Sequence, residues 1–72
     1  MKNKIRLDTM SDINEFVAIT TKCNGRIVVK DNEGHCVNAK SLLGMVYAME
    51  FKELYIEAEE NIYREISKFI VV

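Results

Sequence analysis

The segment Val37–Ala48 constrains the fold more than any other part of this chain. It begins as the end of a strand, turns at Asn38 and continues as a short helix that is apolar on two sides. On a helix of about 3.6 residues per turn, these side chains are Leu42, Met45 and Val46 on one side and Leu43 and Tyr47 on the other. A single buried face does not accommodate all of them. We therefore expect some, above all Leu43, at the surface, where exposed apolar clusters mark docking sites.

The rest of the chain has the patterns of strands and amphipathic helices. Side-chain alternation and β-branched residues predict strands at Lys4–Leu7, Arg26–Lys30, His35–Val37 and Leu54–Ala58. Helical spacing predicts a first helix capped by Ser11 or Asp12 and ended by Asn24 and Gly25. The helix that contains Ser41 should start near Asn38 or Ala39. A last amphipathic helix should run from Glu59 almost to the C-terminus, with a buried stripe of Ile62, Ile66, Phe69 and Ile70.

These elements predict an α+β fold of the order β-α-β-β-α-β-α, in which helices cover one face of an antiparallel sheet. The inward side chains of the sheet should be Ile5, Leu7, Ile27, Val29, Val37, Leu54 and Ile56. With 72 residues the chain forms one domain, residues 1–72, near the lower size limit for a stable core. Periodicity alone leaves a ferredoxin-like arrangement of the same elements open.

Charge and composition exclude several function classes. Ten basic and eleven acidic residues are spread along the chain and leave a net charge of −1, so no basic surface for nucleic acid or a membrane is expected. The longest apolar run is too short to span a bilayer, and the N-terminus has no apolar signal region, which predicts a cytoplasmic protein. Two cysteines, Cys23 and Cys36, and one histidine do not supply a four-ligand zinc site. We expect free thiols, no metal and no cofactor.

The stretch Val-Asn-Ala-Lys-Ser-Leu-Leu-Gly, residues 37–44, resembles the segment around the regulatory serine of HPr, the histidine-containing phosphocarrier of the bacterial sugar phosphotransferase system. The order of elements on both sides agrees with that family over nearly the whole chain. The resemblance implies an open-faced sandwich with strand order 1-4-2-3 and three helices on one face of the sheet.

The phosphocarrier site of that family is missing here. HPr carries Gly-x-His-Ala-Arg-Pro after its first strand, whereas this chain has Leu-Asp-Thr-Met-Ser-Asp-Ile at residues 7–13. Thr9 falls closest to the position of the phosphoacceptor histidine, and Asp8 and Asp12 would repel a phosphoryl donor. The only histidine, His35, lies beside a hairpin turn. It is either a surface strand residue, a relocated phosphoacceptor or a pH-sensitive contact. We expect neither phosphohistidine relay nor enzymatic activity.

Two features of the resemblance carry over to this chain. Ser41 matches the regulatory serine, and its alternative role is that of a helix cap. By the resemblance, Leu42, Leu43, Met45 and Val46 correspond to the apolar patch through which HPr meets its partners, and the partner-binding residues that we predict are Lys40, Leu42, Leu43, Val46 and Tyr47. Leu42, Met45 and Val46 have the alternative of lying in the core.

The sequence thus favours a non-catalytic regulatory or protein-interaction module related to the phosphotransferase system. Its expected partners are proteins of that system or of carbon regulation, and the chain itself should be a monomer or weak homodimer. One alternative is a phosphoryl substrate modified at Ser41 by an HPr-type serine kinase. Another is a structural module that dimerises through the open face of the sheet, where Val28, Cys36 and Tyr55 should point.

Overall fold

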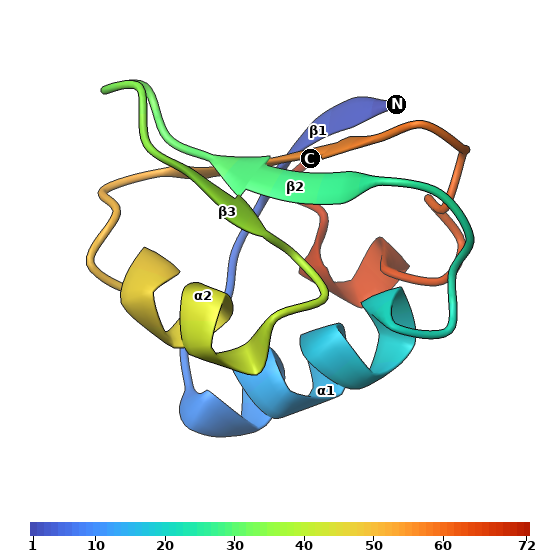
Figure 1. Ribbon diagram of the computed structural model, residues 1–72, viewed down its shortest axis with the longest axis horizontal. Helices are drawn as coiled ribbons and strands as arrows, with labels where there is room; N and C mark the ends of the chain where they lie inside the picture. The colour runs from blue at the N-terminus through green and yellow to red at the C-terminus, as the bar shows by residue number, and fades with distance from the viewer.

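Four antiparallel strands form one sheet, and two α-helices lie against one of its faces (Figure 1). The computed structural model describes residues 1–72. The elements are β1 (Lys2–Ile5), α1 (Met10–Thr20), β2 (Ile27–Lys30), β3 (Cys36–Asn38), α2 (Leu42–Ala48), β4 (Leu54–Ala58) and the 3-10 helix η1 (Ser67–Phe69). The spatial order β1-β4-β2-β3 confirms the expected 1-4-2-3 arrangement.

The alternation of the strands separates a buried face from an open one. Ile5, Ile27, Val29, Leu54 and Ile56 point from the sheet toward the helices and are buried, as is Leu7 beyond the end of β1. Val37 was expected with them but is only partly buried. It lies on β3 at the edge of the sheet, where no further strand covers it.

Helix α1 starts earlier than the sequence indicates. Thr9 is its N-cap, and the Thr9 hydroxyl accepts a hydrogen bond from Asp12 N at 3.1 Å. Ser11 and Asp12 therefore lie inside the first turn, because the helix begins directly after Thr9. The helix ends at Thr20 with Thr21 as its C-cap, before the expected end at Asn24 and Gly25. Gly25, at φ 83°, adopts the left-handed conformation that glycine tolerates in the turn that leads to β2.

Helix α2, in contrast, starts later than expected, at Leu42 with Ser41 as its N-cap. Asn38 and Ala39, the expected start, instead extend the sheet and make a turn. Ala39 N donates to Ile27 O at 3.0 Å, and Ser41 N donates to Asn38 O at 3.0 Å. Pairing with β2 thus keeps these residues extended until the turn is complete.

The third α-helix, expected from Glu59 almost to the C-terminus, does not form. Only Ser67–Phe69 is helical, as a 3-10 turn. Ile62, Ile66 and Phe69 of the expected stripe are buried, but Ile70 is only partly buried. The reason lies in the residues that follow. Arg6 N donates to Phe69 O at 2.8 Å and Val71 N donates to Lys4 O at 2.9 Å, so the chain becomes extended beside β1. Pairing with the sheet replaces the helical bonds that the C-terminal turns would have made.

The two edges of the sheet consequently differ. The residues after η1 run along β1, with an antiparallel bridge between Ile5 and Ile70 (Figure 1). At the other edge β3 pairs only with β2. No helix of the chain combines the length and the apolar character that crossing a bilayer requires.

Candidate functional site

Helix α2 carries apolar side chains on two faces, and only one of them is used for packing. Met45 and Ala48 are fully buried in the core and hold the helix against the sheet and α1. Four other apolar residues of the same helix remain at the surface: Leu42, Leu43, Val46 and Tyr47, with exposed fractions of 46%, 81%, 37% and 51%. We call these four residues the α2 patch. The expectation that Leu43 is exposed is confirmed, and Leu42 and Val46 do not lie in the core.

Aromatic contacts extend the α2 patch toward the β2–β3 hairpin. The ring of Tyr47 meets Phe51 edge to face, with centroids 5.6 Å apart and planes at 85°. Phe51 stacks in turn on His35, at 5.4 Å and 27°. The half-buried Phe51 therefore links the exposed end of α2 to the only histidine of the chain.

His35 has an orienting partner that the sequence analysis missed. Its Nδ1 lies 2.6 Å from Asp31 Oδ2, and the other oxygen of Asp31 accepts hydrogen bonds from the backbone N–H groups of Glu33 and His35, each at 2.9 Å. Burial acts to raise the pKa of Asp31, but these hydrogen bonds outweigh it and hold the pKa below its ordinary value. The signal in the sequence is the Asp-x-x-x-His spacing within a turn, which allows an Asx turn to present its free oxygen to the ring.

The same turn brings together the only set of potential metal ligands in the structure. Oxygen or nitrogen atoms of Asp31, Glu33 and His35 lie within 4.8 Å of one another. Both oxygens of Asp31 already accept hydrogen bonds from the turn and from the imidazole. The arrangement is accounted for by turn geometry.

At the start of α2, the hydroxyl of Ser41 accepts a hydrogen bond from Gly44 N at 3.0 Å. The first turn contains no acidic residue. A Cβ atom on residue 44 would approach the Ser41 hydroxyl to 3.3 Å, so glycine at this position leaves room for the cap. Lys40 does not point freely into solvent, because its Nζ donates to Cys23 O at 2.7 Å and joins the turn before α2 to the turn after α1.

Thr9 lies at a different helix start, that of α1, and is used there as the N-cap. Asp12 Oδ2 accepts a hydrogen bond from Asp8 N at 2.9 Å, and Asp8 forms an ion pair with Arg6 at 2.9 Å. Carboxylates thus occupy the helix start where an incoming phosphoryl group would need free N–H groups and positive charge.

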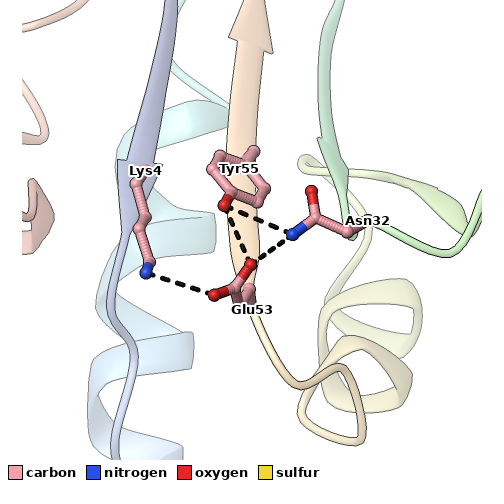
Figure 2. A network of polar contacts seen from close by, with 4 residues as sticks. All are labelled: Lys4, Asn32, Glu53 and Tyr55. Carbon is pink, nitrogen blue, oxygen red and sulfur yellow. Dashed lines mark hydrogen bonds and ion pairs between the residues drawn. The ribbon is translucent and has the colours of Figure 1, made fainter.

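On the open face of the sheet, polar side chains contact one another. Figure 2 shows Glu53 at the centre of one network. Its carboxylate accepts hydrogen bonds from Tyr55 OH at 2.9 Å and from Lys4 Nζ at 3.5 Å, and the Asn32 side-chain amide also contacts it. The Tyr55 hydrogen bond, followed by the charge of Lys4, lowers the pKa of Glu53. The sequence analysis did not single out Glu53 or Asn32, because their meeting depends on which strands become neighbours.

A second group on this face is centred on Glu57. Lys30 Nζ lies 3.1 Å from its carboxylate and Lys2 Nζ lies 3.9 Å away, on the strands that flank β4. The hydrogen bond from Lys30 lowers the pKa of Glu57 more than burial raises it, and the charges of both lysines add to this effect. The open face is therefore internally paired, whereas the α2 patch is not.

Comparisons of the chain with protein-family models, with characterised proteins and with solved structures find no match. The resemblance to HPr therefore remains a hypothesis based on the residues quoted for it.

Proposed function

We propose that this chain is a non-catalytic HPr-like protein that binds other proteins through the α2 patch and takes no part in phosphohistidine relay. The observation that carries the proposal is the exposure of four apolar side chains on a helix that Met45 and Ala48 already anchor. Exposed apolar residues scattered singly are normal, but these four lie on one short helix and continue into Phe51 through Tyr47.

The partners that we propose are proteins of the bacterial sugar phosphotransferase system or of carbon regulation, met in the cytoplasm. The support is the likeness of residues 37–44 to the HPr regulatory segment, together with the strand order that this likeness implies. A relay role is left out because Thr9, in place of histidine, is engaged as a helix cap beside two carboxylates.

The test is isothermal titration calorimetry, in which the purified chain is titrated with purified phosphotransferase enzymes and with a carbon-control regulator. We expect binding that Leu43→Asp and Tyr47→Asp each weaken at least tenfold, because a charge placed in an apolar contact must be desolvated. Tyr63→Asp is the matched control, since Tyr63 is 42% exposed and lies outside α2. Binding that survives both α2 variants would contradict the proposal.

A second candidate function is regulation by phosphorylation of Ser41 by an HPr-type serine kinase. The observation in its favour is the position of Ser41 at the start of a helix whose first turn lacks carboxylates. There a phosphate would meet the favourable end of the helix dipole. Incubation with HPr kinase and ATP should add one phosphate by intact mass, and Ser41→Ala should abolish it. No gain of mass would leave Ser41 as a cap alone.

The third expectation, dimerisation through the open face, has no observation in its favour. Such a dimer would bury the ion pairs around Glu53 and Glu57, and the cost of desolvating charges offsets what their pairing contributes.

A further inference from the structure

The uncovered edge of β3 presents backbone groups that have no partner strand. Val37 is paired with Val29, and the flanking hydrogen bonds Ala39 N to Ile27 O and Asp31 N to His35 O mark the bonded pairs of the ladder. Because bonded and non-bonded pairs alternate in an antiparallel ladder, the N–H and C=O groups of Cys36 and Asn38 point away from β2. The Asn38 carbonyl also accepts a hydrogen bond from Ser41 N, which leaves it one lone pair.

Very short strands, charged residues, proline, bulges or a covering segment protect most sheet edges. The β3 edge is short, with three residues, but it lacks the other protections. The residues of β3 are Cys36, Val37 and Asn38, none of them charged, whereas the other edge is covered by the residues around Ile70. The β1 edge of the sheet is therefore covered, whereas the β3 edge is open.

The charges beyond the two ends of β3 have opposite sign. Glu33 is exposed at the hairpin end, where Asp31 is already paired with His35. Arg26 and Lys40 lie at the end that leads into α2, where Lys40 Nζ also donates to Cys23 O. Two copies of β3 in antiparallel contact would bring the acidic end of each copy beside the basic end of the other. Such a surface is complementary to itself, as a two-fold interface requires.

We infer that the β3 edge pairs with the β3 edge of a second copy of this chain, antiparallel and with Val37 on the two-fold axis. In this register Cys36 of one copy exchanges both backbone hydrogen bonds with Asn38 of the other. Glu33 of one copy then falls opposite Ser41 of the other, next to its Lys40. The inference does not rest on the proposed function, because it uses no residue of the α2 patch.

The dimer should be weak, because a three-residue strand buries less than the roughly 1,200 Å² typical of stable interfaces. Sedimentation equilibrium up to about 1 mM protein, the range of weak association, is the first measurement. We expect concentration-dependent dimers in the unmodified chain. A monomer at all concentrations would overturn the inference.

Cys36→Pro tests the backbone groups, since proline removes an N–H that points outward and leaves the β2 ladder intact. We expect it to weaken the dimer at least tenfold, whereas Cys36→Ser should not. Thermal unfolding of both variants shows whether they fold. A dimer that survives in folded Cys36→Pro, or that Tyr47→Asp abolishes instead, uses another surface and overturns the inference.

A charge exchange tests the register without relying on proline. Glu33→Lys and Lys40→Glu should each weaken the dimer severalfold, because each places like charges together twice. The double variant should restore it, and an equimolar mixture of the two single variants should form heterodimers. Because Lys40 also contacts Cys23 O, restoration in the double variant separates pairing from a folding defect. Failure of the double variant to restore a dimer, although it folds, would contradict this register.

A third readout is Val37→Cys combined with Cys23→Ala and Cys36→Ser. Residues at the centre of a non-bonded antiparallel pair have Cα atoms about 4.5 Å apart, within the range that a disulfide spans. Mild oxidation should cross-link this variant far faster than Tyr63→Cys in the same background. Equal rates would overturn the register.

Discussion

The α2 patch and the open face of the sheet are both exposed, but their side chains are partnered differently. On the open face, Glu53 and Glu57 each gather polar groups from neighbouring strands, and the contacts close within the chain (Figure 2). On α2, Leu43 extends into solvent with 81% of its surface exposed. The comparison indicates that the charged face is satisfied by itself, whereas the apolar patch gains most from a second molecule.

The largest difference in the free energy of unfolding should be between substitutions on the buried face and on the exposed face of α2. Met45→Ala removes a fully buried side chain and should lower the free energy of unfolding by about 2–5 kcal/mol. Leu43→Ala changes a side chain at the surface and should stay within about 0.5 kcal/mol. Urea denaturation measures both. Similar losses would mean that Leu43 packs in the core and that the α2 patch is misidentified.

The next effect concerns the cap that positions the patch. Ser41→Ala leaves Gly44 N without its side-chain acceptor and should cost about 1 kcal/mol. Ser41→Asp keeps an acceptor at the same place and should recover most of this loss. If the aspartate variant is as unstable as the alanine variant, the hydroxyl does more than accept this hydrogen bond.

The open face should make stability depend on pH. The folded pKa values of Glu53 and Glu57 are lowered, as is that of Asp31, so the unfolded chain binds protons first as the solution is acidified. This stabilisation is complete above the ordinary carboxyl range, about pH 5, and is lost as pH falls through the folded values. The urea concentration at the midpoint of unfolding should therefore decrease when the pH is lowered below about 4. Glu53→Gln with Glu57→Gln should flatten the curve, and an unchanged curve would contradict the paired face.

The smallest effect should separate the two lysines around Glu57. Lys30 Nζ lies 3.1 Å from the carboxylate, whereas Lys2 Nζ lies at 3.9 Å with 70% of its side chain exposed. Lys2→Gln should leave the urea midpoint unchanged within error, and Lys30→Gln should lower it slightly, because exposed pairs contribute little. A larger decrease of the urea midpoint in Lys2→Gln than in Lys30→Gln would show that Lys2 is the more important partner of Glu57.

Much of the candidate site could be predicted from the segment Val37–Ala48, because helical spacing is a local property. One short helix carries more apolar residues than a single buried face accommodates, so we expected Leu43 at the surface. Its exposure confirms this expectation. The contacts of Phe51 and the pairing of Asp31 with His35 were missed. They depend on a turn conformation and on the approach of the β2–β3 hairpin to the end of α2.

Alternation and helical spacing were sufficient to predict the inward residues of β1, β2 and β4 and the buried stripe of Ile62, Ile66 and Phe69. The tertiary structure prevents this stripe from forming an α-helix, because the residues after Phe69 pair with β1. It likewise brought Lys4 and Asn32 together at Glu53 and left β3 without a covering strand. Alternation and helical spacing describe which side of an element is apolar. Which backbone or charge it meets depends on residues distant in the sequence, and local patterns do not encode them.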